Sequence, residues 1–210
     1  MRFTAVIGQL LLAASLALGF TLPAQAQITA GKEYLLVKPP QPTDSGNKVE
    51  VMEFFWYGCP HCFTLEPLIA AWTKTLAPDI YFRQLPFAFI GPPEHQKLFY
   101  ALEELGQREA LQRRIFNAIH VDRQRINTEA EITNFVVANG VDRAKFADAW
   151  KSFGVNTKLS RGKQLSNAYK IDGVPAIGIQ GRYYTSATLA GSHEKALAVT
   201  NYLIDRARKA

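Results

Sequence analysis

Apolar side chains form short runs that predict strands, separated by longer stretches with a helical pattern. Residues 49–57 (VEVMEFFWY) are rich in β-branched and aromatic residues, which favour a strand. Their apolar positions fall on both parities, as expected for a central strand that is covered on both faces. A second strand is predicted over residues 80–90 (IYFRQLPFAFI), which a glycine and two prolines follow. The stretch between them predicts a helix after Gly58, with Pro60 in its first turn and a kink at Pro67.

Residues 94–169 have a helical pattern with clear start and stop signals. Thr128 with Glu131 matches a capping box, and Asp142 is suited to the N-cap of another helix. Three glycines stand where C-terminal caps are expected, at Gly106, Gly140 and Gly154. Four aromatic residues in and before this region are expected in the core: Phe87, Phe89, Phe99 and Tyr100.

Strand-forming residues return near the C-terminus. Residues 176–180 and 182–185 predict a hairpin around the turn Gln180-Gly181. Ser192 is then expected to cap a last amphipathic helix, with apolar residues on one side at Leu197, Tyr202 and Leu203. The order of elements predicts an α/β fold in which a block of helices interrupts the strands.

The first 26 residues have the pattern of an export signal. Arg2 is their only charge, residues 10–20 are apolar, and Ala24-Gln25-Ala26 supplies a small-x-small cleavage site. The apolar run is too short to span a bilayer, which takes about 20 residues. The alternative is a buried or amphipathic helix that is never removed. We expect cleavage before Gln27 and a secreted or periplasmic protein.

The composition narrows the class of protein without identifying it. The 210 residues are 48% hydrophobic, 11% aromatic and 20% charged, which excludes a disordered or fibrous chain. The net charge of +6 suits nucleic acid or an anionic membrane. However, the basic residues are dispersed, and no glycine-rich phosphate loop or basic-aromatic repeat accompanies them. We therefore expect a solvated basic surface and no nucleic-acid partner.

Two cysteines, three positions apart, carry the candidate chemistry. Cys59 and Cys62 lie where the first predicted strand meets the following helix. Free N–H groups and the dipole at a helix N-terminus stabilise a thiolate, which lowers the pKa expected for Cys59. A protonated His61 lowers it further, and Pro60 fixes the backbone between the sulfurs. Cys62, one turn into the helix, is expected to be less exposed and to act as the resolving thiol.

Other roles for this pair fit the residues less well. A structural disulfide across so short a loop contributes only about 2 kcal/mol. A zinc site lacks a second C-x-x-C or histidine pair, and covalent haem attachment needs a histidine where Phe63 stands. A cysteine hydrolase has no need of the second thiol. Thiol–disulfide exchange is the hypothesis that uses both cysteines.

The segment 53–62 (EFFWYGCPHC), together with residues 173–176 (GVPA), resembles the DsbA family of bacterial periplasmic thiol:disulfide oxidoreductases. The resemblance covers essentially the whole chain after the export signal. It implies a thioredoxin-like α/β fold with an inserted helical domain. The expected division is residues 1–26 for the signal peptide, 27–91 and 170–210 for the two parts of the thioredoxin-like domain, and 92–169 for the helical insertion.

The resemblance also implies a proline loop beside the cysteines. Thioredoxin-like families carry a cis peptide bond there, which in this chain is Val174–Pro175, although most X-Pro bonds are trans. Unfolded chains are expected to pair their backbone along Val174 and Pro175. An ordinary proline at the start of a strand is the alternative.

The resemblance also points to two acidic residues as further candidates. Glu53 interrupts an apolar strand, so burial is expected to raise its pKa and let it carry a proton near the sulfurs. The alternative is a carboxylate that reaches the sheet edge. Glu66, one turn past Cys62, is the second candidate, and a solvated helix face is its alternative. Arg83 or Gln84 is expected to meet these acids. Three histidines are expected at the surface or at helix caps: His95, His120 and His193.

The implied activity is that of a periplasmic dithiol oxidase. A substrate thiolate attacks Cys59 to give a mixed disulfide, and a second substrate thiol then displaces Cys59. The implied partners are reduced exported polypeptides and a DsbB-like, quinone-linked membrane oxidase. A monomer without cofactor or metal is expected. A disulfide isomerase or reductase of the same fold, or a non-enzymatic periplasmic binding module, are the alternatives.

Overall fold

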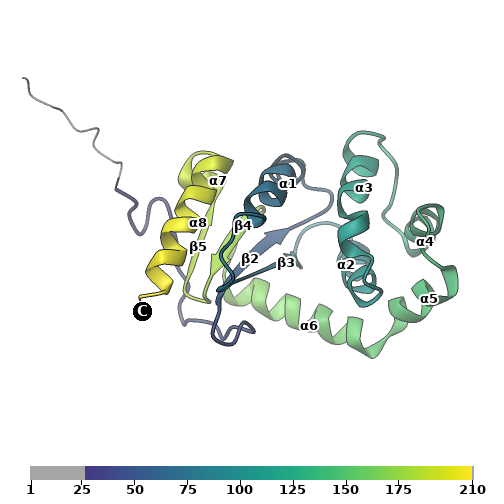
Figure 1. Cartoon of the computed structure of the whole chain (residues 1–210). Helices are drawn as coiled ribbons and strands as arrows, with labels where there is room; N and C mark the ends of the chain where they lie inside the picture. Colours follow the sequence, from purple (N-terminus) through teal and green to yellow (C-terminus); the bar gives the residue numbers. More distant parts are fainter. Residues whose placement is uncertain (1–26, 210) are drawn as a thin grey trace, which may run out of the picture.

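A mixed five-stranded sheet forms one end of the molecule in a computed structural model, which describes residues 27–209 (Figure 1). Its strand order is β1-β5-β4-β2-β3, and β2 and β3 are the parallel pair. The strands are β1 (Leu35–Leu36), β2 (Val49–Phe55), β3 (Ile80–Pro86), β4 (Ala176–Ile179) and β5 (Tyr183–Ser186). The helices are α1 (Pro60–Thr73), α2 (Pro93–Glu104), α3 (Arg108–His120), α4 (Glu129–Ala138), α5 (Arg143–Lys151), α6 (Phe153–Ala168), α7 (Ala187–Ala190) and α8 (His193–Ala207).

Helices cover both faces of the sheet, and the remaining helices form a group at the other end of the molecule. α1 and α8 stand beside the sheet, α2 to α5 lie at the far end, and α6 runs back towards the strands (Figure 1). All seven residues of β2 are buried, which confirms the predicted central strand. Val51 packs in the cluster formed with α1 and α8, whereas Phe54 packs with Leu165 and Tyr169 from the end of α6. Successive side chains therefore serve opposite faces, as the pleat requires.

Most of the predicted helix signals are confirmed. The Thr128–Glu131 capping box opens α4, and side chains of Asp142 and Ser192 cap α5 and α8. Gly106 and Gly140 follow α2 and α4 with φ of +67° and +90°. The prediction for Gly154 is wrong, because this residue lies in the first turn of α6. There Ser152 caps the helix, so α6 starts almost directly after α5.

The second strand is shorter than predicted. β3 ends at Pro86, and only one more backbone bond follows, from the Phe87 N–H to the Phe55 carbonyl at 2.7 Å. The chain then turns past the indole of Trp56, and Gly91 adopts a φ of +76° against that ring. Phe89 consequently lies on the turn and is 52% exposed, so its predicted place in the core is wrong. The other three aromatic residues are buried, as predicted: Phe87, Phe99 and Tyr100.

The C-terminal hairpin and helix follow the prediction with one exception. Gln180 and Gly181 have φ of 50° and 63° and are the central residues of a turn that the hydrogen bond from the Arg182 N–H to the Ile179 carbonyl closes at 3.0 Å. In α8, Leu203 is fully buried and Leu197 is half-buried. Tyr202 is 38% exposed, contrary to the prediction, and its ring lies against Tyr34 at the edge of the helix.

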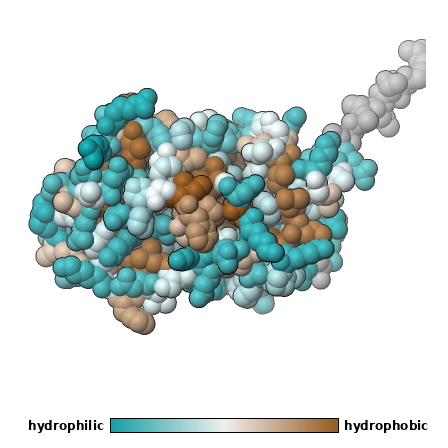
Figure 2. Space-filling view, turned by 180° about the vertical axis from the view of Figure 1, so that it is seen from behind, coloured by the Kyte–Doolittle hydropathy of each residue, from teal (hydrophilic) through white to brown (hydrophobic). Residues whose placement is uncertain are grey.

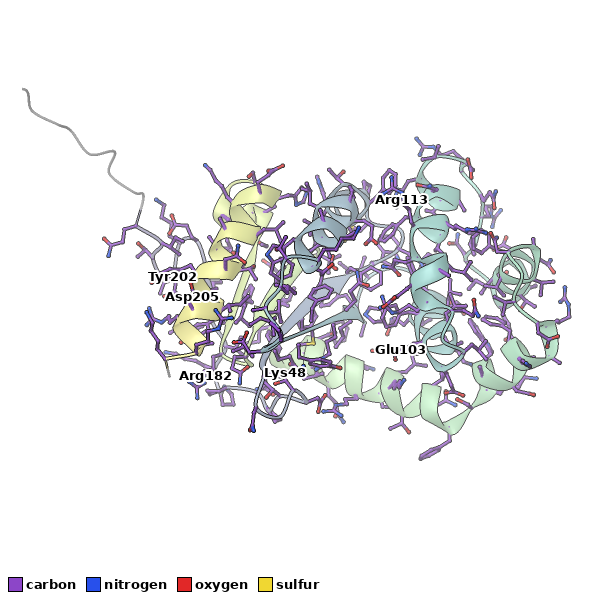
Figure 3. The ribbon with its side chains drawn as sticks, in the orientation of Figure 1. Lys48, Glu103, Arg113, Arg182, Tyr202 and Asp205 are labelled. Carbon is purple, nitrogen blue, oxygen red and sulfur yellow. The ribbon has the colours of Figure 1, made fainter. Side chains whose placement is uncertain are left out.

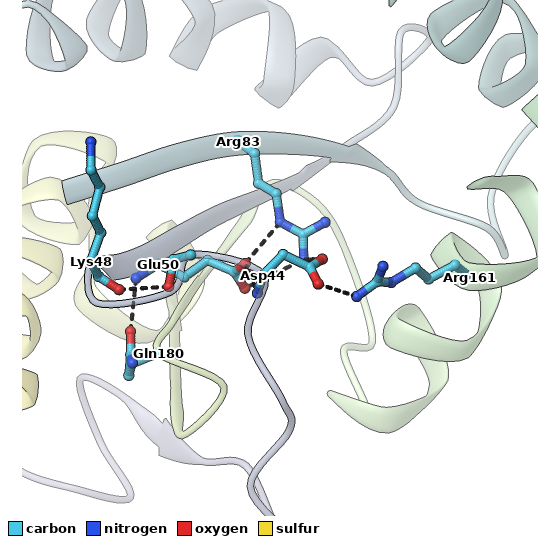
Figure 4. Close-up of polar contacts among 7 residues, drawn as sticks. Asp44, Lys48, Glu50, Arg83, Arg161 and Gln180 are labelled. Carbon is cyan, nitrogen blue, oxygen red and sulfur yellow. Dashed lines mark hydrogen bonds and ion pairs between the residues drawn. The ribbon is translucent and has the colours of Figure 1, made fainter. Parts of the chain in front are cut away.

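A polar cluster ties the start of the sheet to α6 (Figure 4). The buried carboxylate of Glu50 accepts a hydrogen bond from Arg83 Nε at 3.1 Å and from the Asp44 backbone N–H. Asp44 in turn pairs with Arg83 and with Arg161 of α6. Arg83 therefore bonds Glu50 and Asp44 near the start of β2, so of the two predicted partners, Arg83 or Gln84, it is not Arg83 that bonds Glu53.

Residues 27–209 contain no helix with the length and apolar character needed to cross a membrane. The predicted signal peptide lies outside the described residues. Helices α2 to α6 fill most of the interval assigned to the helical insertion, between β3 and β4. The boundaries at residues 91–92 and 169–170 themselves stay a prediction.

Candidate functional site

Cys59 and Cys62 lie at the N-terminus of α1, where β2 leads into the helix. Cys59 is the N-cap residue, and its Sγ accepts a hydrogen bond from the Cys62 backbone N–H at 3.2 Å. Cys59 is 6% exposed and Cys62 is fully buried, which confirms the predicted difference in access. Pro60 occupies the first helical turn and His61 is exposed beside it. Both sulfurs are free thiols in this structure.

The two thiols have opposite tendencies to ionise. A hydrogen bond from the Cys62 side chain, then backbone N–H groups of Cys62 and His61 and the His61 charge, lower the pKa of Cys59 to about 6, against the effect of burial. Burial raises the pKa of the Cys62 thiol far above its ordinary value, and the adjacent Cys59 raises it further. A thiolate at this site is therefore held on Cys59, while Cys62 keeps its proton.

The proline loop packs directly against the reactive sulfur. Sγ of Cys59 lies 3.4 Å from the carbonyl oxygen of Val174, and the Val174–Pro175 peptide bond is cis, which the family resemblance implies and the sequence alone left open. A cavity of about 510 Å³ opens beside this contact. Its lining includes His61, Val174, Pro175, Tyr184, Leu189 and His193. The structure thus brings Cys59 into contact with the predicted Val174–Pro175 loop, and the adjacent cavity is lined by that loop and by His61 from between the cysteines.

Glu53 lies within the sheet and faces the start of α1. It shares the face of β2 that Val51 and Phe55 also use, and it is 1% exposed. The Gln84 Nε2 group donates a hydrogen bond to Glu53 Oε2 at 2.8 Å, which confirms Gln84 as a partner. Burial raises the pKa of Glu53 to about 8, and this hydrogen bond opposes the rise. The expectation of a buried carboxyl is therefore confirmed, and the carboxyl can hold a proton near neutral pH.

Glu66 is half-buried on the adjoining side of α1. Burial raises its pKa, while Gln112 and Arg108 of α3 act in the opposite direction. Arg113 also extends from α3 towards α1 (Figure 3), and its charge lowers the pKa of Glu66. Glu66 therefore does not lie on a solvated helix face, which was the alternative interpretation, but packs beside polar residues of α3.

Three further residues of this network were not predicted from the sequence. Arg108 Nη1 donates to Gln84 Oε1 at 2.7 Å, and Tyr57 O–H donates to Gln112 Oε1 at 2.9 Å. Arg108 and Gln112 are four residues apart, so both lie on one face of α3. A glutamine at a buried helix position is the one available sequence signal, and it does not say which partner it meets.

The prediction that His95 lies at the surface or caps a helix is wrong, because Pro92 is the N-cap of α2 and no side chain caps this helix. This histidine is 2% exposed, and its Nδ1 accepts a hydrogen bond from Trp56 Nε1 at 2.9 Å. Its Nε2 therefore carries the proton and donates to the Ile126 carbonyl at 2.7 Å. His120 is half-buried at the end of α3, where it bonds the Tyr57 carbonyl at 2.8 Å. His193 begins α8 and faces His61, with 6.4 Å between the ring centres.

Within residues 27–209, no group of three or more histidine, cysteine or acidic side chains is placed to hold a metal ion.

Comparison with known proteins gives consistent matches over the chain. The DSBA-like thioredoxin domain family matches residues 93–198. A thiol:disulfide interchange protein DsbA from Bordetella parapertussis is 40% identical over 203 residues, covering 96% of this chain and 97% of that protein. The protein of the same name from Pseudomonas aeruginosa is 38% identical over 205 residues, again with 96% and 97% coverage.

Solved structures agree with these sequence matches. A crystal structure of Pseudomonas aeruginosa DsbA has a TM-score of 0.83 and 37% identity, covering 87% of this chain and 95% of that one. The DsbA oxidoreductase of Xylella fastidiosa has a TM-score of 0.80 and 26% identity, covering 87% and 99%. The expected thioredoxin-like fold with inserted helices is therefore confirmed.

Proposed function

Because this chain belongs to the DsbA family of thiol:disulfide interchange proteins, we propose that its Cys59–Cys62 pair is the redox centre and donates a disulfide to reduced, exported polypeptides. The chain is a thiol:disulfide oxidoreductase. The observation that supports oxidation of the substrate, and not its reduction, is that the pKa of Cys59 is lowered while the pKa of Cys62 is raised. A stabilised thiolate at Cys59 favours the reduced form, and a stabilised reduced form makes the disulfide a strong oxidant.

The proposed cycle conserves electrons and protons. A substrate thiolate attacks Cys59 Sγ, the Cys59–Cys62 bond breaks, and Cys62 leaves as a thiolate that takes up a proton. A second substrate thiolate then attacks the substrate sulfur of the mixed disulfide and expels Cys59 as a thiolate. The substrate is oxidised by two electrons and the cysteine pair is reduced by two. The lowered pKa of Cys59 makes it a good leaving group in this second step.

Glu53 is proposed to supply the proton that Cys62 takes up. Transfer from the Glu53 carboxyl gives a Cys62 thiol and a Glu53 carboxylate, which solvent then reprotonates. The pKa of about 8 that burial gives Glu53 keeps the carboxyl protonated at neutral pH. Glu66 is proposed to act on Glu53 through its charge, since an ionised Glu66 disfavours a second carboxylate.

The cavity beside Val174 and Pro175 is proposed to receive an extended segment of the substrate. Leu189 and Tyr184 contribute apolar surface to the wall of this cavity, and His61 and His193 also line it. Apolar surface also gathers in the middle of one face of the molecule and towards its sheet end (Figure 2). These features suit an unfolded chain, whose apolar side chains are exposed. A quinone-linked membrane oxidase of the DsbB kind is proposed to reoxidise the pair, and this chain is proposed to act in the periplasm as a monomer.

The direction of transfer is tested by a redox titration of residues 27–210 against glutathione. We expect a potential above about −180 mV, and a value near that of thioredoxin, about −270 mV, would indicate a reductase instead. Cys59→Ser is expected to abolish oxidation of a reduced two-cysteine peptide while retaining the fold. Retained peptide oxidation by this variant would refute Cys59 as the nucleophilic centre.

A further inference from the structure

A continuous set of hydrogen bonds joins Glu53 of the sheet to helix α3. Gln84 of β3 donates from Nε2 to Glu53 Oε2 at 2.8 Å, while its Oε1 accepts from Arg108 Nη1 at 2.7 Å. Gln112 Nε2 contacts the same Gln84 oxygen at 3.4 Å. One amide therefore stands between the buried carboxyl and a cation that comes from the helices between β3 and β4.

The Arg108 guanidinium fixes which way the Gln84 amide faces. A guanidinium has donors only, so the amide oxygen must point to Arg108 and the amide NH₂ must point to Glu53. Oε2 of Glu53 is thereby kept as an acceptor in both protonation states. When Glu53 is protonated, the proton must consequently reside on Oε1.

Charged groups act on Glu53 from two helices. α1 contributes Cys59 and Glu66, both of which disfavour a carboxylate when they are ionised, and α3 contributes Arg108, which favours it. Glu53 and the buried Cys62 thiol also disfavour each other's ionised forms. Arg108 is the cation of this set, and it opposes the effects of burial and of the neighbouring anions.

We propose that Arg108 is a positioning residue of the disulfide-exchange reaction, which acts through Gln84 to set where Glu53 carries its proton and how readily it releases it. The proposal rests on the proposed role of Glu53 as the proton donor to Cys62. It makes the helical region a contributor to the chemistry of the cysteine pair, in addition to any contact with substrate.

Arg108 also has contacts that a structural role would use. Its guanidinium lies 5.5 Å from the ring centre of Phe99, and it pairs with the exposed carboxylate of Glu109 at 3.3 Å. The test must therefore measure the titration of Glu53 itself, which the loss of packing alone does not shift in a defined direction.

The experiment compares Arg108→Gln with wild type by infrared spectroscopy of the Glu53 carboxyl in the reduced protein, with Glu53→Gln identifying the band. We expect the titration midpoint of Glu53 to rise by about 0.5 to 1 pH unit in Arg108→Gln, because a favourable charge is lost. Arg108→Lys is expected to restore part of the shift. Arg114→Gln is the matched control, since Arg114 also lies on α3 but makes a solvent-exposed hydrogen bond to Asn139.

Gln84→Leu provides a second route if Arg108→Gln does not fold. It retains the cation but removes the Gln84 hydrogen bond, which itself lowers the pKa of Glu53, so the midpoint is again expected to rise; adding Arg108→Lys to Gln84→Leu is then expected to shift it no further, because the bridge is already absent. A midpoint that stays at the wild-type value in either folded variant would overturn the positioning role of Arg108. The proposed role of Glu53 fails separately, if Glu53→Gln leaves the pH profile of substrate oxidation unchanged.

Discussion

Cys59 and Cys62 are three residues apart, yet their surroundings favour opposite protonation states. Cys59 is the cap of α1 and receives hydrogen bonds from the helix start, whereas Cys62 is enclosed in the core. Both effects arise from position alone, because the side chains are chemically identical. The pair is therefore made unequal by the place where the helix begins, and this inequality is what a disulfide donor requires.

The lowered pKa of Cys59 predicts a pH-dependent stability of the reduced protein. In the unfolded chain this thiol has its ordinary pKa of about 8.5, and in the folded protein the pKa is about 6. The thiolate therefore stabilises the fold in full above the unfolded value and loses this effect as the pH falls through 6. Relative to the oxidised protein, which has no thiol, the reduced protein should gain on the order of 1 kcal/mol between pH 5 and pH 7.

Urea unfolding of both redox forms at pH 5, 6, 7 and 8 measures this difference, and absorbance at 240 nm follows the thiolate directly. The oxidised form is the control, because it shares every titrating group except the two thiols, and the Cys62 thiol keeps its proton in the folded protein over this pH range. A stability difference that is the same at pH 5 and pH 7 would contradict the assignment of the thiolate to Cys59.

At the scale of elements, the junction between β2 and α1 is built around the indole of Trp56. Its Nε1 donates to the buried His95, and Gly58 and Gly91 pass so close to the ring that a Cβ on either would overlap it. The Cys59 backbone N–H also bonds the Trp56 carbonyl at 3.0 Å. The position of Cys59 thus depends on the Trp56 ring, which packs against the loops at Gly58 and Gly91 and is hydrogen-bonded to His95 of α2.

Gly91→Ala tests the importance of this packing. A Cβ at Gly91 would lie 2.1 Å from the Trp56 ring, and the φ of +76° already disfavours alanine. Gly106→Ala is the matched control, because its φ is +67° but nothing lies within 4 Å of the added carbon. We expect about 1 kcal/mol of destabilisation at Gly106 and about 2 to 4 kcal/mol at Gly91, measured by urea unfolding. Equal losses at the two glycines would show that the Trp56 contact contributes nothing.

At the scale of the whole molecule, two polar connections add to the apolar packing that joins the helices between β3 and β4 to the sheet. The Asp44–Arg161 pair fastens α6 to the start of the sheet, and the Gln84–Arg108 bond joins α3 to β3. Glu50 anchors the first of these from within the core, where its side chain is 2% exposed. The two connections lie near opposite ends of β2, with Glu50 near its start and Glu53 towards the cysteines.

Removing Glu50 and removing Arg161, the buried and the exposed member of the cluster at the start of β2, should change the free energy of unfolding by different amounts. Glu50→Ala removes a buried carboxylate and leaves Arg83 without its main partner, which should cost about 3 kcal/mol or more. Arg161→Ala removes a side chain that is 53% exposed, so we expect a loss below about 1 kcal/mol. Denaturant unfolding of both variants measures the contrast, and an equal loss would show that burial of Glu50 does not govern the cluster.

Features that depend on neighbouring residues were open to prediction from the sequence. The start of α1 at Pro60, the capping box at Thr128 and the turn at Gln180 all rest on contacts within a few residues. The central strand pairs with distant strands, but its run of β-branched and aromatic residues is a local pattern. The sulfur chemistry belongs to this group, since the bond from the Cys62 N–H to Cys59 spans one helical turn. The predictions for Gly154 and Phe89 were wrong because both residues lie near the ends of elements. There the Ser152 cap and the Trp56 ring determine where the helix begins and where the strand ends.

The sequence by itself therefore determined the reactive pair, the α/β arrangement and the expectation of a buried Glu53. Only the tertiary structure decided what surrounds that carboxyl and the strand-to-helix junction. Arg108 is 55 positions after Glu53 in the chain, and His95 meets Trp56 across 39 positions. The physical reason is that these contacts depend on how helices pack against the sheet, and local patterns of polarity do not specify that packing.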